Sequence, residues 1–150
     1  QVFRQINLQR VLVTIVNPDH KNAIVCEVLP PPTSNTPNTN MMDKRPLRDP
    51  YEFELKHCLI RGTARLFEVT TTEPGRFSVL DSAIALDDNL MLVRGDQVKA
   101  GESQRLELRL EHATILLDGS LIRMENANQF PLELLPMYVT ARNNLFSISK

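Results

Sequence analysis

FELKHCLIRGTARLFEV, residues 53–69, has an order of apolar and polar positions that returns three more times along the chain. The later copies are FSVLDSAIALDDNLMLV from Phe77, LRLEHATILLDGSLIRM from Leu108 and VTARNNLFSISK from Val139. All four align without internal gaps, and their starts at positions 53, 77, 108 and 139 lie 24, 31 and 31 residues apart. Repetition of this kind is typical of proteins built from stacked units.

Each copy begins with the period-two alternation of a β-strand. Phe53, Phe77, Leu108 and Val139 share the first position, Ile60, Ile84, Ile115 and Phe146 the eighth, and Leu66, Leu90 and Leu121 a later one. The segments between the apolar blocks are Thr63-Ala64-Arg65, Asp87-Asp88-Asn89 and Asp118-Gly119-Ser120, of which the last two have turn composition. Each unit is therefore predicted to form a strand, a bend, a short strand, a turn and another strand.

A unit this small cannot bury its apolar face alone, so the repeats predict neighbours stacked around one continuous core. We expect an all-β fold, a parallel β-helix or β-solenoid with about four recognisable coils. The alternative is an antiparallel β-sandwich or jelly roll, because short strands at regular spacing suit that class too. The ungapped alignment favours the solenoid.

The N-terminal part differs from the repeats. Val11, Val13 and Ile15 alternate and the stretch from Ala23 to Leu29 is apolar again, which suggests strand, turn, strand. Residues 30–50 are rich in Pro, Asn and Thr and predict a long exposed loop, whose small basic cluster of Lys44, Arg45 and Arg48 we interpret as solvated. We expect residues 1–150 to form one domain or a fragment of one.

Composition excludes several classes of function. Apolar residues make up 42% and charged residues 23% of the chain, and the net charge is −1, so nucleic acid is not an expected partner. No run approaches the 18 apolar residues of a membrane span. Cys26 and Cys58 are expected to be free, and their spacing matches no zinc or redox motif, so no metal or other cofactor is expected. Nothing in the sequence assigns a compartment.

The repeats resemble those of right-handed parallel β-helix proteins of the pectate-lyase-like group, whose coils often show apolar-x-apolar-x-Asn before a bulky apolar residue. The polar place of that pattern holds His57, Asp81, His112 and Asn143, so only the last copy has the Asn. The resemblance covers about Phe53 to Ser149. It implies a carbohydrate-active enzyme or carbohydrate-binding module, with calcium in the lyases and paired carboxylates in the hydrolases. The chain is also similar to β-helical regions appended to large bacterial multidomain proteins, including Ser/Thr kinases, although these residues contain no kinase motif.

Two sets of polar residues are candidate sites. His57, Asp81, His112 and Asn143 would stack in adjacent coils, where alternating His and carboxylate could bind a metal or relay protons. They share the phase of the inward apolar residues and lie where a strand bends, which favours a structural polar ladder that satisfies buried backbone groups. Asp87, Asp88 and Asp118 are candidate binding carboxylates, although Asp is also what a turn prefers at these positions.

We therefore expect a non-catalytic scaffold or interaction segment of a larger protein, with an unidentified protein or glycan as its partner. Its variable surface would be formed by the insertions from Thr70 to Arg76, Arg94 to Arg105 and Glu125 to Pro136. The alternative function is a carbohydrate-binding or carbohydrate-cleaving module of the pectate-lyase-like kind.

Overall fold

The computed structural model describes residues 5–17, 23–29, 49–70, 73–94, 104–125 and 134–149, and these residues form an all-β structure. Their fourteen strands all pair in parallel and belong to three sheets. Of the predicted insertions, residues 71–72, 95–103 and 126–133 lie outside the described residues, as do residues 30–48 of the predicted loop and the basic cluster within it.

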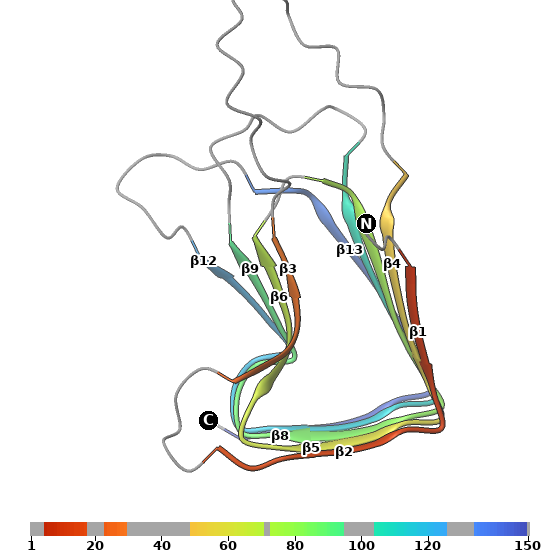
Figure 1. Ribbon diagram of the computed structural model, residues 1–150, viewed down its shortest axis with the longest axis vertical. Coiled ribbons are helices and arrows are strands. Elements are labelled where there is room, and N and C mark those ends of the chain that lie inside the picture. The colour runs from red at the N-terminus through yellow and green to blue at the C-terminus, as the bar shows by residue number, and fades with distance from the viewer. Residues whose placement is uncertain are drawn as a thin grey trace, which may run out of the picture.

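Successive strands along the chain enter the three sheets in turn, so one strand from each sheet makes a rung of the stack (Figure 1). Sheet A contains β1 (Gln5–Gln9), β4 (Tyr51–Lys56), β7 (Gly75–Leu80), β10 (Leu106–Glu111) and β13 (Met137–Arg142). Sheet B contains β2 (Leu12–Ile15), β5 (Leu59–Gly62), β8 (Ala83–Leu86), β11 (Thr114–Leu117) and β14 (Leu145–Ile148). Sheet C contains β3 (Ile24–Val28), β6 (Arg65–Thr70), β9 (Met91–Arg94) and β12 (Ile122–Glu125).

The strand registers match the repeat alignment residue by residue. Phe53 pairs with Phe77, Phe77 with Leu108, and Leu108 with Val139 in sheet A. In sheet B the same steps join Ile60, Ile84, Ile115 and Phe146. The antiparallel sandwich is therefore wrong, because the described strands pair only in parallel, and the arrangement is consistent with a β-solenoid.

The core lies between the three sheets and consists of columns of like residues. Ile60, Ile84 and Ile115 form one such column and are at most 1% exposed. Phe67 joins two sheets, because its ring lies 5.0 Å from those of both Phe53 and Phe77. Such aromatic contacts add to the free energy gained from burial of apolar area.

The N-terminal segment forms a further rung that the four-unit alignment leaves out. Ile6 pairs with Phe53 and Val13 with Ile60, so β1, β2 and β3 extend the same three sheets. The isolated strand, turn, strand predicted for this region is therefore incomplete. Gly62 is required where the first two rungs meet, because a Cβ at this residue would lie 2.0 Å from the carbonyl oxygen of Ile15.

Replacing a residue of the inner column should destabilise the stack far more than replacing its outward neighbour. Ile115 is fully buried whereas Leu116 is 43% exposed. We expect Ile115→Ala to lower the free energy of unfolding by about 2–5 kcal/mol because it leaves a cavity, and Leu116→Ala to lower it by less than about 1 kcal/mol. Urea titration of both variants measures the difference; equal losses would contradict the assigned core.

Candidate functional site

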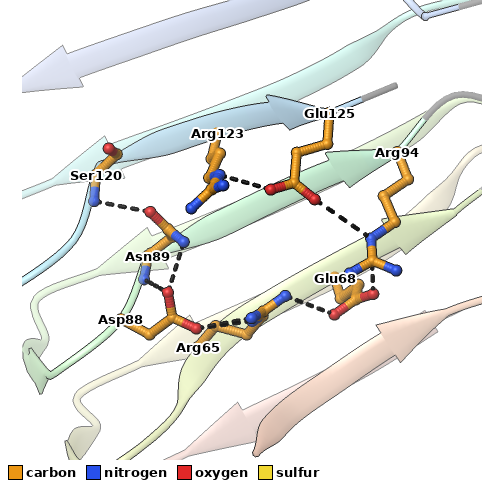
Figure 2. A network of polar contacts seen from close by, with 8 residues as sticks. All are labelled: Arg65, Glu68, Asp88, Asn89, Arg94, Ser120, Arg123 and Glu125. Carbon is orange, nitrogen blue, oxygen red and sulfur yellow. Dashed lines mark hydrogen bonds and ion pairs between the residues drawn. The ribbon is translucent and has the colours of Figure 1, made fainter. Parts of the chain in front are cut away.

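A chain of ion pairs runs across three strands on the outer face of sheet C (Figure 2). Arg65, at the start of β6, places Nη2 2.9 Å from Oδ2 of Asp88 in the next rung. Its Nη1 donates to Oε2 of Glu68 at 3.0 Å. The side chains of Arg65 and Glu68 are only 8% and 6% exposed, so this pair is largely removed from water.

From Glu68 the network continues to the next two strands of the sheet, β9 and β12 (Figure 2). Arg94 Nε lies 3.3 Å from Oε1 of Glu68 and 3.9 Å from Oε2 of Glu125, and Arg123 Nε lies 2.6 Å from the other oxygen of Glu125. Three arginines thus face three carboxylates and their charges balance. Since each carboxylate already contacts an arginine, we interpret the network as a connection between rungs rather than as reactive groups.

At the turn before β9, backbone groups join the same network. Asp88 Oδ1 accepts hydrogen bonds from the backbone N and Nδ2 of Asn89, at 2.7 and 2.6 Å. Asn89 is only 3% exposed, and its Oδ1 atom accepts a 2.8 Å hydrogen bond from the backbone N of Ser120 in the next rung. The turn composition of Asp88 and Asn89 therefore has a second use, because the two side chains satisfy buried backbone and arginine donors.

Removing the charge of Glu68 should test how much this network contributes. We expect Glu68→Gln to lower the free energy of unfolding by about 3 kcal/mol, because it leaves Arg65 and Arg94 without part of their compensating charge at a buried position. Glu107→Gln is the matched control, since Glu107 also contacts two arginines, Arg76 and Arg105, but its side chain is 33% exposed, compared with 6% for Glu68. Its loss should stay below about 1 kcal/mol. Denaturant titration at low and high salt measures both, and equal losses would exclude a special contribution from burial.

The predicted polar ladder lies at the corner between sheets A and B. His57, Asp81, His112 and Asn143 have φ angles of 54°, 47°, 51° and 52°, and Arg10 has the same conformation in the first rung at 56°. All five residues are exposed. The phase of the preceding strand points these side chains inward, but the left-handed backbone ends that alternation and turns them out of the stack.

The structure brings these side chains together along the corner. Asp81 lies between two histidines, with its carboxylate oxygens 4.0 Å from Nδ1 of His57 and 3.4 Å from Nδ1 of His112. Nδ2 of Asn143 lies 3.2 Å from Nε2 of His112. Among the described residues, no group of three or more His, Cys, Asp or Glu has the geometry to hold a metal ion.

The side chains that hydrogen-bond to backbone groups on the inner side of this corner come one position later, at residues that the repeat pattern did not single out. The hydroxyl of Ser82 donates to the carbonyl of Leu80 and accepts from the backbone N of Cys58 at 3.0 Å. In the last rung, Asn144 makes both of its bonds to the preceding rung: Nδ2 donates to the carbonyl of Leu110 and Oδ1 accepts from the backbone N of Ala113. This place in the repeat holds Cys58, Ser82, Ala113 and Asn144, so it is clearly polar in only two of the four copies and gives a weak sequence signal.

Because His112 has a positive φ, we expect replacement by glycine to be less destabilising than replacement by a β-branched residue. Glycine adopts a positive φ without strain, so we expect His112→Gly to change the free energy of unfolding by less than about 0.5 kcal/mol. A β-branched residue is disfavoured there, so His112→Val should cost about 1–2 kcal/mol. Thr140→Val, at an exposed extended position of β13, is the control and should be close to neutral. Thermal unfolding ranks the three variants; equal stability of the Gly and Val variants would show that the corner does not constrain the backbone.

Two of the three predicted carboxylates are brought together and one is not. Asp87 and Asp118 both follow sheet B at its second corner, where the backbone N of Asp118 donates to the carbonyl of Leu86, the residue before Asp87. Both are exposed and border a hollow of about 440 Å³ that Leu116, Ser147 and Ser149 also line. Asp88 instead points into the ion-pair network of sheet C.

A groove on the outer face of sheet A lies over β10 and β13. It encloses about 450 Å³, and its lining includes Arg105, Arg109, Tyr138, Thr140 and Arg142. The guanidinium carbon of Arg105 lies 5.3 Å from the centre of the Tyr138 ring, within the range of a cation–π contact.

Two glutamates partly neutralise the positive charge of this groove. Glu107 and Glu111 line it and pair along their own strand with Arg105 and Arg109, at 2.6 and 2.8 Å. The hydrogen bond from Arg109 lowers the pKa of the Glu111 carboxyl, and the same contact raises the pKa of Arg109. Both residues therefore stay charged over the physiological range, and Arg142 adds a positive charge to the groove.

Both cysteines are free, as the sequence analysis predicts. Burial raises the pKa of the Cys26 thiol to about 11, so the thiolate that reacts as a nucleophile is scarce at neutral pH. The Cys58 thiol lies 3.4 Å from the carbonyl oxygens of Leu8 and Lys56, at the inner side of the sheet A–B corner. Neither thiol has the environment of a catalytic cysteine.

Comparison of the chain with protein-family models, with curated proteins and with solved structures gives no match. In the part of the chain that the structure describes, no helix is long and apolar enough to cross a membrane.

Proposed function

We propose that this chain is a β-solenoid segment that serves as a non-catalytic scaffold or interaction segment of a larger protein. In-register rungs make a rigid rod whose outer faces can each hold a different set of side chains. The best-defined charged cluster, on sheet C, is internally balanced and joins three rungs. A stack that is held together in this way is suited to act as a scaffold that positions binding surfaces.

The observation that carries this proposal is the exposure of apolar side chains in the two end rungs. In the last rung, Val139, Phe146 and Ile148 continue apolar columns that are buried in the middle rungs, yet they are 44%, 39% and 47% exposed. In the first rung, Ile6 is 41% exposed. Repeat stacks bury such columns beneath capping or neighbouring units, so both ends are suited to carry further β-structure.

Hydrogen–deuterium exchange tests the proposal on the chain itself. We expect backbone amides of β13 and β14 to exchange at least about 100-fold faster than those of β10 and β11, because each end strand has one neighbour among the described strands and its apolar residues are open to water. A protein that the chain supports by stacking on this end should slow exchange in the same two strands. Full protection of β13 and β14 in the monomeric chain would contradict the idea that the ends require a partner.

A second candidate function, a carbohydrate-binding or carbohydrate-cleaving module, is favoured by the sheet A groove. Tyr138 offers an aromatic surface there, and Arg142 offers donors that suit the carboxylates of an acidic polysaccharide. The exposed pair of Asp87 and Asp118 lies on a different face, at the corner between sheets B and C.

Polygalacturonate with and without calcium separates the two functions. The scaffold proposal expects no cleavage, and it expects Asp118→Asn to melt at the same temperature as the unchanged chain in either condition. Binding that Arg142→Gln weakens would favour the glycan module. Calcium-dependent cleavage, or calcium stabilisation that Asp118→Asn abolishes, would contradict the scaffold proposal.

A further inference from the structure

The outer face of sheet B differs from the other two outer faces of the stack. Two positions of each strand point outward, one on either side of the inward column that contains Ile60, Ile84 and Ile115. From the first rung to the last, the first of these positions holds Leu12, Leu59, Ala83, Thr114 and Leu145, and the second holds Thr14, Arg61, Ala85, Leu116 and Ser147.

This face is apolar and open to water. Leu12, Leu59, Leu116 and Leu145 are 65%, 42%, 43% and 63% exposed. Sheets A and C carry ion pairs on their outer faces, whereas these ten positions of sheet B hold a single charged residue, Arg61. Exposed leucines gathered on one regular face mark a contact surface more often than leucines scattered singly.

We propose that this face binds the same face of a second copy of the chain, related by a two-fold axis that runs parallel to the strands over β8. The small residues of β8, Ala83 and Ala85, would meet their own copies at the centre. Two sheets can then approach to the usual separation of about 10 Å. An isologous contact of this kind closes on itself and makes every pairwise contact twice.

The register of sheet B fixes which residues would meet. The axis places β5 against β11 of the second copy and β2 against β14, so Leu12 faces Leu145 and Leu59 faces the methyl group of Thr114. Leucines at the two ends of one copy are thus covered by apolar atoms of the other.

Charge complementarity supports the second copy as the occupant. Among the described residues, Arg61 has no ion-pair partner and donates one side-chain hydrogen bond, to Oγ1 of Thr14. It would lie against Leu116 of the second copy, and Asp118 follows two residues later on the same edge. Asp118 is exposed and likewise lacks an ion-pair partner in the described part of the chain. In the dimer, Arg61 of each copy would therefore lie near Asp118 of the other copy, which gives two such charge pairs.

The size of the face indicates a weak dimer. Five strands of four residues make a sheet of about 13 by 24 Å, or about 300 Å² of flat area on each copy. This is below the area of a standard stable interface. We therefore expect a dissociation constant on the order of 100 µM rather than a permanent dimer.

Sedimentation equilibrium of the full chain over a range from about 10 µM to 1 mM tests the proposal. The mean mass should rise towards twice the monomer mass. Leu116→Glu should weaken association at least tenfold, because it places a carboxylate within the apolar contact. Tyr138→Ser, which removes an exposed apolar side chain from sheet A, is the control and should leave association unchanged.

A charge exchange keeps the test independent of any loss of folding in the glutamate variant. Arg61→Asp should weaken association because it would face Asp118 of the second copy, and combining it with Asp118→Arg should restore it. A chain that stays monomeric up to 1 mM would overturn the proposal. Association that survives Leu116→Glu but is lost in Phe146→Ser would also overturn it, since the contact would then lie at the end rungs.

Discussion

Parallel hydrogen bonding in register between neighbouring rungs places each residue directly above its counterpart in the next repeat, and this constraint governs both the core and the surface. For apolar residues it is favourable, because a column such as Ile60, Ile84 and Ile115 stacks like side chains on one another and removes them from water. For charged residues it is costly unless successive rungs alternate in sign. On sheet A, Arg76 stands between Glu52 and Glu107 and lies 3.3 Å from a carboxylate oxygen of each.

The same constraint explains why the corner between sheets A and B keeps its backbone shape while its residue type changes. Five successive corners have φ angles between 47° and 56° and are occupied by Arg, His, Asp, His and Asn. Hydrogen bonds between rungs impose one corner geometry on all of them, as when the backbone N of His112 donates to the carbonyl of Arg142. The side chains point outward, so residues that tolerate a positive φ can replace one another there at little cost to the core.

The repeat pattern predicts the stack because burial repeats with it: the apolar columns that begin at Phe53 and Ile60 pair in the expected register through all four repeats. The first rung was missed although Ile6, Leu8, Arg10 and Val13 follow the spacing of Phe53, Leu55, His57 and Ile60, because it begins 47 residues earlier rather than 24 or 31. The sheet C network was missed for a different reason. Glu68, Leu92 and Arg123 share one column, and alternation in type leaves no periodic signal for a sequence comparison to find.

The distribution of charge among the three outer faces indicates where contacts with other proteins can form. Removing a balanced, partly buried network such as that of Arg65, Glu68 and Arg94 from water would break or desolvate bonds already made, so the face of sheet C resists a close partner. The face of sheet B has no such bonds to lose, and covering its leucines removes apolar area from water. In the last rung Val139, Phe146 and Ile148 are exposed, and β13 and β14 each have one neighbour among the described strands. Under the proposed function, we therefore expect partners to bind at the ends of the stack and along the face of sheet B rather than on the charged faces of sheets A and C.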